Sequence, residues 1–199
     1  AGTGMDALAH AVECYTMAYH QPFTDAVALQ AIDYVSRWLR VAYEDGSNLD
    51  ARYHMSLAAM PAGMSYGTDS AGAAHAMSQS AGGVHDVPHG DLTGRVLGPV
   101  VEYNYMGDPP RFARIAEAMG KETRNLHATD AAERAVDEVY QLTEDLNIPT
   151  LHQLGFTEDE IPMLAKIAHE DPQTIGNPRE VDQAGYEQIY ARAFEAGRR

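Results

Sequence analysis

Apolar residues recur at helical spacing along almost the whole chain. Residues 25–43, DAVALQAIDYVSRWLRVAY, show the pattern clearly, because apolar side chains three or four positions apart cover one broad face. These side chains are Val27, Leu29, Ile32, Val35, Trp38, Leu39 and Val41. The strict alternation of apolar and polar residues that is typical of strands is nearly absent. The pattern therefore predicts an all-α, bundle-like protein.

Capping and turn residues divide the chain into about nine helical stretches. The first expected helix runs from about Met5 to Tyr19, the second from a cap at Thr24 or Asp25 to the break at 44–48, and the third from this break to about Met64. The fourth starts at a cap at Asp69 or Ser70 and ends in 80–83, the fifth runs from the loop 84–90 to about Tyr103, and a short sixth starts at the turn 107–110. The last three cover 129–146, 157–170 and 181–196. No internal repeat or low-complexity segment is visible. We expect one all-helical domain over residues 1–199.

The composition is that of a globular protein and excludes several functions. With 199 residues, 45% of them hydrophobic, the chain can bury a core. A formal charge of −15 repels nucleic acid and anionic membranes, so neither is an expected partner. The sequence has neither a transmembrane segment nor a secretion signal, and a cytoplasmic protein is the default expectation. Cys14 is the only cysteine, so no intramolecular disulfide can form, and we expect a buried, inert thiol.

The acidic surface has two explanations that the sequence leaves open. Only two of the 14 basic residues are lysines, Lys121 and Lys166, and acidic residues outnumber basic ones. Such a surface stays hydrated in concentrated salt, which would suit a halophilic protein. A GC-rich genome that favours alanine and arginine codons produces the same bias.

Histidines and a carboxylate form two candidate clusters for chemistry. Asp6 and His10 are four positions apart in a predicted helix, so both side chains lie on one face. Alone, such a pair is usually an ordinary surface pair. His75, His85 and His89 lie within 71–92, around turns marked by glycine and proline. His75 follows two alanines in a predicted helix, where a buried imidazole needs an acceptor or a metal.

Three imidazoles and one carboxylate suit Fe²⁺, Zn²⁺, Mn²⁺ or Co²⁺ better than Ca²⁺ or Mg²⁺, which prefer oxygen ligands. An ion held in this way acts as a Lewis acid on a substrate oxygen. The other histidines are expected to be surface or structural groups: His20, His54, His127, His152 and His169.

Five sequence blocks together resemble the C-terminal helical domain of the iron-containing (group III) alcohol dehydrogenases. They are TGMDALAHAVECY, FTDAVALQAI, AGMSYGTDSAGAAHAM, VPHG and GNPR, in the family's order from about residue 1 to 196. The resemblance implies a dehydroquinate synthase-like α domain with the metal ligands Asp6, His10, His75 and His89. It also implies an N-terminal α/β domain, absent from this chain, that binds NAD or NADP. AGTG at 1–4 has no preceding strand that would make it a cofactor fingerprint.

The resemblance also points to residues for proton transfer. Many members have a further histidine four positions after His75, whereas this chain has Gln79, which cannot titrate. His85 or a chain of waters is the candidate replacement, and the alternative is that His85 merely faces solvent.

Two further positions match substrate-pocket residues of the family. Tyr66 lies nine residues before His75, where the family places an aromatic residue, and Gln173 lies in the loop before GNPR. A core tyrosine and a solvated glutamine are the alternative interpretations. In GNPR itself, Asn177 and Pro178 are expected to play a structural role, since they favour a fixed turn.

The expected function is therefore a metal-dependent, NAD(P)-linked alcohol dehydrogenase that oxidises an alcohol reversibly by hydride transfer. The ligand spacing and the VPHG block fit this branch better than the family's lyases. Fe²⁺ is the expected ion, a small alcohol or aldehyde is the expected partner, and the domain alone should be inactive. A helical metal-dependent hydrolase and a non-catalytic helical module are the alternatives. The substrate, the choice of NAD or NADP and a homo-oligomeric state are left open.

Overall fold

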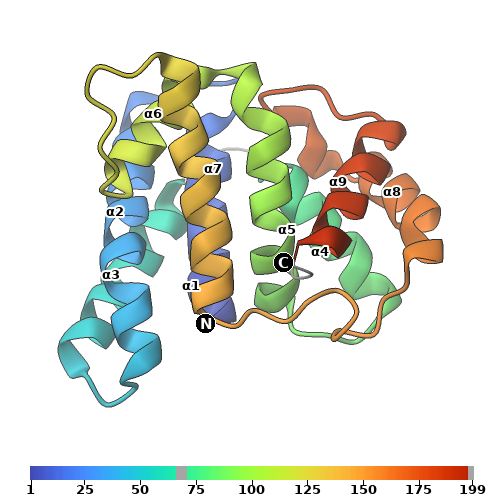
Figure 1. The fold of residues 1–199 in the computed structure, drawn as a ribbon, viewed down its shortest axis with the longest axis horizontal. Coiled ribbons are helices and arrows are strands. Elements are labelled where there is room, and N and C mark those ends of the chain that lie inside the picture. The colour runs from blue at the N-terminus through green and yellow to red at the C-terminus, as the bar shows by residue number, and fades with distance from the viewer. Residues whose placement is uncertain (66–70, 197–199) are drawn as a thin grey trace.

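The computed structural model describes residues 1–65 and 71–196, and these residues form helices without a strand (Figure 1). The α-helices are α1 (Gly2–Thr16), α2 (Pro22–Glu44), α3 (Leu49–Ser65), α4 (Ala73–Val84), α5 (His89–Asn104), α6 (Pro109–Ala118), α7 (Ala128–Asp145), α8 (Ile161–Glu170) and α9 (Gln183–Glu195). Three short 3-10 helices, η1 (Tyr105–Gly107), η2 (Glu158–Glu160) and η3 (Pro172–Gly176), connect them. The prediction of an all-α fold with about nine helices is confirmed.

The first two helices differ from the sequence prediction at their ends. Helix α1 begins at Gly2 instead of Met5 and ends at Thr16 instead of Tyr19. Helix α2 begins at Pro22, and its N-cap is Gln21, whose side chain accepts a hydrogen bond from the Thr24 amide at 2.8 Å. A proline fits the first turn of a helix because it has no amide hydrogen to leave unpaired. The expected cap at Thr24 or Asp25 was therefore too late.

Helix α4 also starts differently from the prediction. The expected caps, Asp69 and Ser70, lie outside the described residues. The helix begins at Ala73 after Gly72, and Gly72 supplies no side-chain cap. Partners from other parts of the chain therefore have to bind the first amides of α4.

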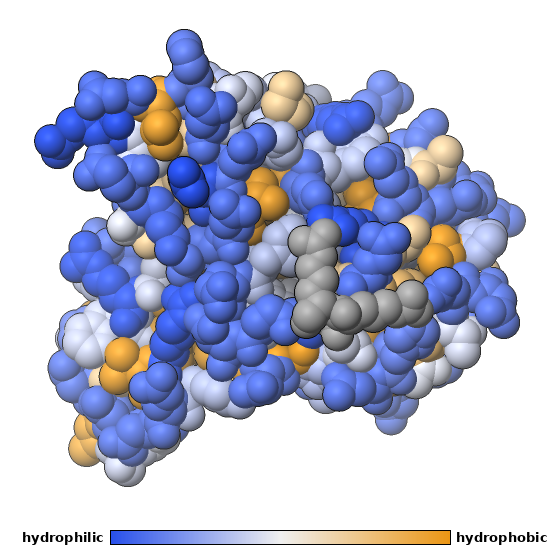
Figure 2. Space-filling view, viewed as in Figure 1, coloured by the Kyte–Doolittle hydropathy of each residue, from blue (hydrophilic) through white to orange (hydrophobic). Residues whose placement is uncertain are grey.

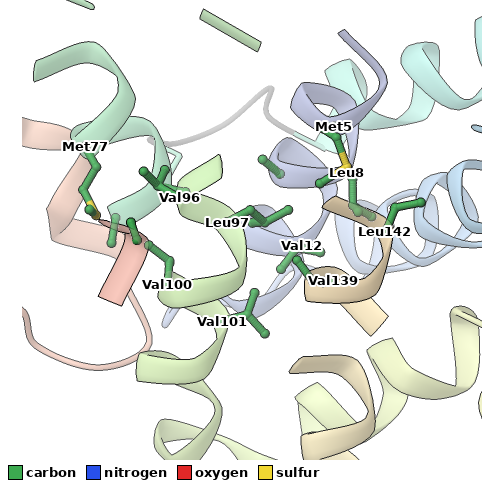
Figure 3. Packing of buried hydrophobic residues seen from close by; sticks show 14 of the residues in the cluster. Met5, Leu8, Val12, Met77, Val96, Leu97, Val100, Val101, Val139 and Leu142 are labelled. Atoms are coloured by element: carbon green, nitrogen blue, oxygen red, sulfur yellow. The ribbon is translucent and has the colours of Figure 1, made fainter. Parts of the chain in front are cut away.

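Helix α1 lies at the centre of the bundle. It packs against α2, α3 and α5, while α6 and α7 cover one side and α4, α8 and α9 pack beyond α5 (Figure 1). Met5, Leu8 and Val12 of α1 are buried, and Figure 3 shows them among side chains of α5 and α7. Gly94 allows α5 to approach, because a β-carbon there would lie 2.9 Å from the Cβ of Met5. The centre of the bundle is thus formed by α1 packed on several sides by other helices.

A buried arginine links two other segments of the chain to α5. Arg95 is 3% exposed, and its guanidinium donates to the carbonyl oxygens of Pro149 at 2.9 Å, Ala196 at 3.1 Å and Ile148. The carboxylate of Glu144 is 3.6 Å away. Arginine suits this position because its planar group carries five donors in a fixed arrangement. This side chain joins the end of α7 and the end of α9 to the middle of α5.

The surface in Figure 2 is dominated by hydrophilic side chains, with hydrophobic residues scattered among them. Within the described ranges, no helix is both long and apolar enough to cross a membrane.

We predict that Arg95→Met destabilises the fold by about 3 kcal/mol, because it leaves buried carbonyl groups without donors. Urea denaturation followed by circular dichroism measures the change. The matched control is Arg37→Met, which removes an arginine whose side chain is 69% exposed and should change stability by less than about 0.5 kcal/mol. Equal urea midpoints for the two variants would contradict the role assigned to Arg95.

Candidate metal centre

Three helices bring the four predicted ligands to one place. Asp6 and His10 lie on α1, His75 is the third residue of α4, and His89 is the first residue of α5. Asp6 Oδ1 lies 3.6 Å from His75 Nε2 and 3.4 Å from His89 Nε2. Asp6 Oδ2 lies 3.8 Å from His10 Nε2. The carboxylate of Asp6 is therefore the common neighbour of all three imidazoles.

These separations are long for hydrogen bonds and suit a shared ion. Ligands bound tetrahedrally at about 2.1 Å from a transition metal lie about 3.4 Å from one another. Asp6 Oδ1 and His75 Nε2 are buried and, within the described part of the chain, form no hydrogen bond. Buried polar atoms almost always have a partner, and a cation between these atoms would supply one. The residues present therefore fit a divalent metal ion.

His89 lies at the edge of the cluster. The ligand atoms of Asp6, His10 and His75 all lie within 4.8 Å of one another, and His89 is outside this group. Its side chain is 45% exposed, and its Nε2 is 3.3 Å from the hydroxyl of Thr93. The structure thus shows a three-residue core with a fourth candidate ligand at the rim.

Electrostatics favour the ligand forms of two of these groups. Burial opposes ionisation of Asp6, but the imidazoles of His75, His89 and His10 outweigh it and hold the pKa of the carboxyl well below its usual range. Burial, followed by the charge of His75, lowers the pKa of His10. An ionised carboxylate and a neutral imidazole are the forms that bind metals.

His75 has the opposite shift in the absence of a metal. Burial lowers its pKa, but the carboxylates of Glu13 and Asp6 outweigh burial and raise the pKa to about 10. Glu13, on α1, is the residue that sequence reasoning missed. One of its oxygens contacts His75 Nδ1, and the other accepts a hydrogen bond from the Ala74 amide at 2.6 Å. The helical spacing indicates this role, because positions 6, 10 and 13 fall on one face of a helix.

The loop before α9 touches the start of α4. The Gln173 side chain accepts a hydrogen bond from the Ala71 amide at 2.6 Å. Asn177 accepts one from the Ala73 amide at 3.3 Å, which agrees with the structural role expected for it. The two side chains therefore bind backbone amides at the start of the helix that carries His75.

The predicted proton-transfer residues lie on α4 and just after it. The Gln79 side chain is exposed on α4. His85 follows the end of α4, its Nε2 lies 2.7 Å from Glu160 Oε1, and its ring packs edge-on against Phe156. The structure thus pairs His85 with a carboxylate from another element. The predicted substrate residue Tyr66 lies outside the described residues.

Comparison with known proteins decides the family. The model of the Fe-containing alcohol dehydrogenase family, C-terminal part, matches residues 1–194. The chain belongs to this family. It is 53% identical over 192 residues to a choline dehydrogenase of Bacillus subtilis, a match that covers 96% of this chain and 48% of the relative. It is 42% identical over 195 residues to a 1,3-propanediol dehydrogenase of Citrobacter freundii, covering 98% and 50%.

A solved structure of a relative agrees with the fold of this family member. The crystal structure of a 1,3-propanediol oxidoreductase superposes with a TM-score of 0.95 at 42% identity, covering 98% of this chain and 51% of that chain. The chain spans about half the length of the curated relatives it matches. The relatives named here are dehydrogenases, and none supports the hydrolase alternative.

We predict that Zn²⁺ stabilises this protein through the cluster. An ion present at about 100 times its dissociation constant should add about 2.7 kcal/mol to the free energy of unfolding. Urea denaturation with and without Zn²⁺ measures the gain. His75→Ala should abolish it, whereas His127→Ala, which changes an exposed histidine at the start of α7, should retain it. An equal gain in both variants would show that Zn²⁺ binds elsewhere.

Proposed function

We propose that this chain is the metal-binding catalytic half of an NAD(P)-linked alcohol dehydrogenase, which interconverts an alcohol and its aldehyde or ketone. The observation that carries the proposal is the convergence of the Asp6 carboxylate with three imidazoles, in a chain that belongs to the Fe-containing family. Asp6, His10, His75 and His89 are the proposed ligands. Fe²⁺ is the proposed ion, and the same donors also suit Zn²⁺, Mn²⁺ and Co²⁺.

The proposed metal would supply Lewis-acid chemistry by polarising the oxygen of the alcohol or carbonyl substrate. Asp6 offsets part of the ion's charge, while three neutral imidazoles leave the remainder available to that oxygen. His75, whose Nε2 is buried, lies on the inner side of the site. The partly exposed ring of His89 marks the side from which substrate arrives.

The nicotinamide cofactor needs a site that the described helices do not provide. Dinucleotides bind at glycine-rich loops between a strand and a helix, and residues 1–65 and 71–196 contain no strand. We place NAD or NADP chiefly on a nucleotide-binding α/β domain that works together with this half. A nicotinamide cofactor bound there would supply the hydride chemistry, while the proposed ligands of this half, Asp6, His10, His75 and His89, would hold the ion.

His85 is the proposed proton carrier. An imidazole can donate and accept a proton, whereas the side-chain amide of Gln79 cannot act as a general base. Glu160 accepts a hydrogen bond from His85 Nε2 at 2.7 Å and so orients the ring. The His85 side chain is 33% exposed and therefore accessible to solvent. The family relation favours a small alcohol as substrate, and choline and 1,3-propanediol, named for two relatives, are the first compounds to assay. A homo-oligomeric state and adaptation to salt stay predictions.

A chimaera tests the proposed activity. Residues 1–199 are joined to the half of the Bacillus subtilis choline dehydrogenase that they do not match. We expect NAD(P)-dependent oxidation of a small alcohol, followed by absorbance of the reduced cofactor at 340 nm, and complete loss after chelation. His75→Ala in the chimaera should remove the ion and the activity together, because it removes the proposed ligand whose buried nitrogen forms no hydrogen bond with the described residues.

Two results would contradict the proposed function. One is a folded chimaera that binds the ion but oxidises none of a panel of small alcohols with either cofactor. The other is metal-dependent ester or amide hydrolysis by residues 1–199 without NAD(P), which would revive the hydrolase alternative. His127→Ala in the chimaera is the matched control for loss of a histidine outside the site.

The proton-transfer role of His85 has a separate test. His85→Gln in the chimaera should lower kcat about 100-fold near neutral pH, since general acid–base groups typically contribute 10²–10⁴-fold. The pH profile of kcat should also lose one ionisation, while the metal content stays at the wild-type level. An unchanged pH profile would leave His85 as a surface group paired with Glu160.

A further inference from the structure

We propose that Glu13 is a positioning residue for the metal site. Its carboxylate holds His75 in the tautomer and orientation that turn Nε2 toward Asp6 and His10. This inference rests on the proposed function only in that it requires the site to bind a divalent ion.

Each oxygen of the Glu13 carboxylate has a partner at the start of α4. Oε2 lies against His75 Nδ1, and Oε1 accepts a hydrogen bond from the Ala74 amide at 2.6 Å. A carboxylate can only accept hydrogen bonds, so Nδ1 has to be the protonated nitrogen. Nε2 can then offer its lone pair to an ion, and this buried nitrogen forms no hydrogen bond with any residue of 1–65 and 71–196. The ring is thus clamped between α1 and the backbone of its own helix.

Gly72, the residue before α4, leaves room for the Glu13 carboxylate. A β-carbon at Gly72 would lie 2.8 Å from Glu13 Oε1 and 3.1 Å from its Cδ. Asn177 Oδ1 would lie 3.3 Å from the same β-carbon. Glycine at 72 is therefore required for close approach, and any larger residue would push the carboxylate away from His75.

The charge of Glu13 also points to the metal. Glu13 is 3% exposed, and within the described ranges the basic group at ion-pair distance from it is His75, with no lysine or arginine there. Glu138, which is 6% exposed, has both Arg40, at 2.9 Å, and Lys121 beside it. Buried carboxylates normally need such a partner. A divalent ion held by the neutral ring of His75 would take the place of the charge of a protonated ring beside Glu13 and Asp6.

Glu13→Gln separates positioning from a purely structural role. The glutamine oxygen can still accept from the Ala74 amide, so the start of α4 should remain capped. Its NH₂ group would face His75 Nδ1 and donate to it, which places the proton of the neutral ring on Nε2 and blocks the ligand atom. A residue that only caps the helix would tolerate this change.

The experiment uses the 199-residue chain with Zn²⁺ as the probe. Competition with a chelator measures affinity, and ¹⁵N NMR of the histidines, with His75 assigned from the His75→Ala spectrum, identifies the protonated nitrogen. Wild type loaded with Zn²⁺ should show a slowly exchanging proton on Nδ1. Glu13→Gln should bind Zn²⁺ about 100-fold more weakly, the upper part of the range for loss of an outer-shell partner, and lose that proton signal. Glu138→Gln, the matched buried carboxylate, should keep wild-type affinity.

Gly72→Ala gives a second route that keeps the charge of Glu13 but displaces it. It should weaken Zn²⁺ binding about tenfold and shift the Nδ1 proton signal, and it stands in if Glu13→Gln does not fold. The proposal is overturned if folded Glu13→Gln or Gly72→Ala retains wild-type affinity, or if Glu138→Gln weakens binding equally. Wild type that binds no Zn²⁺, Fe²⁺ or Co²⁺ would instead overturn the proposed function, and the positioning role with it.

Discussion

The structure depends on packing a polar stripe of α1, half-buried at Asp6 and His10 and buried at Glu13, among apolar helices. Asp6, His10 and Glu13 lie along one face of a helix that is packed on several sides by other helices. Polar groups in such a place destabilise a fold unless each finds a partner. Those partners come from α4 and α5. The packing of these two helices against α1 therefore also determines the geometry of the site.

The approach of α5 to α1 shows how helix packing positions the proposed metal ligands. A β-carbon at Gly90 would lie 2.6 Å from the carbonyl carbon of Gly2, so the first turns of α1 and α5 touch through their backbones. This contact brings His89, at the first position of α5, within 3.4 Å of Asp6. A bulkier residue at Gly90 would separate the helices and the ligands together. Small residues here serve the site as much as the core.

The sequence predicted those parts of the fold and site that depend on local order. Helical periodicity predicts the number of helices, and the spacing of Asp6 and His10 places both on one face. Pairing His75 and His89 with them needed the family resemblance, because nothing in local spacing says which helices meet. The early end of α1 and the cap at Gln21 were missed, since a helix end depends on what the neighbouring segments supply.

The residues that sequence reasoning missed are those whose roles arise only after packing. Glu13 looks like any polar residue of an amphipathic helix until α4 is laid against it. Arg95 likewise reads as a surface charge until the ends of α7 and α9 close over it. The position of His89 at the rim also depends on tertiary structure, because it is the packing of α5 against α1 that places its side chain beside Asp6.

The late GNPR block acquires a physical connection to the metal site through the start of α4. Asn177 binds the Ala73 amide and pairs with the side chain of Asn104 on α5, so it ties the loop to two helices that carry proposed ligands. The next amide, that of Ala74, binds Glu13, and the next residue is His75. Because α4 has no side-chain cap of its own, these distant partners determine where its first turn lies. The position of the His75 ring is therefore fixed from α1 and from the loop before α9 together, which explains how a structural motif about 100 residues away in the sequence can matter to the ligands.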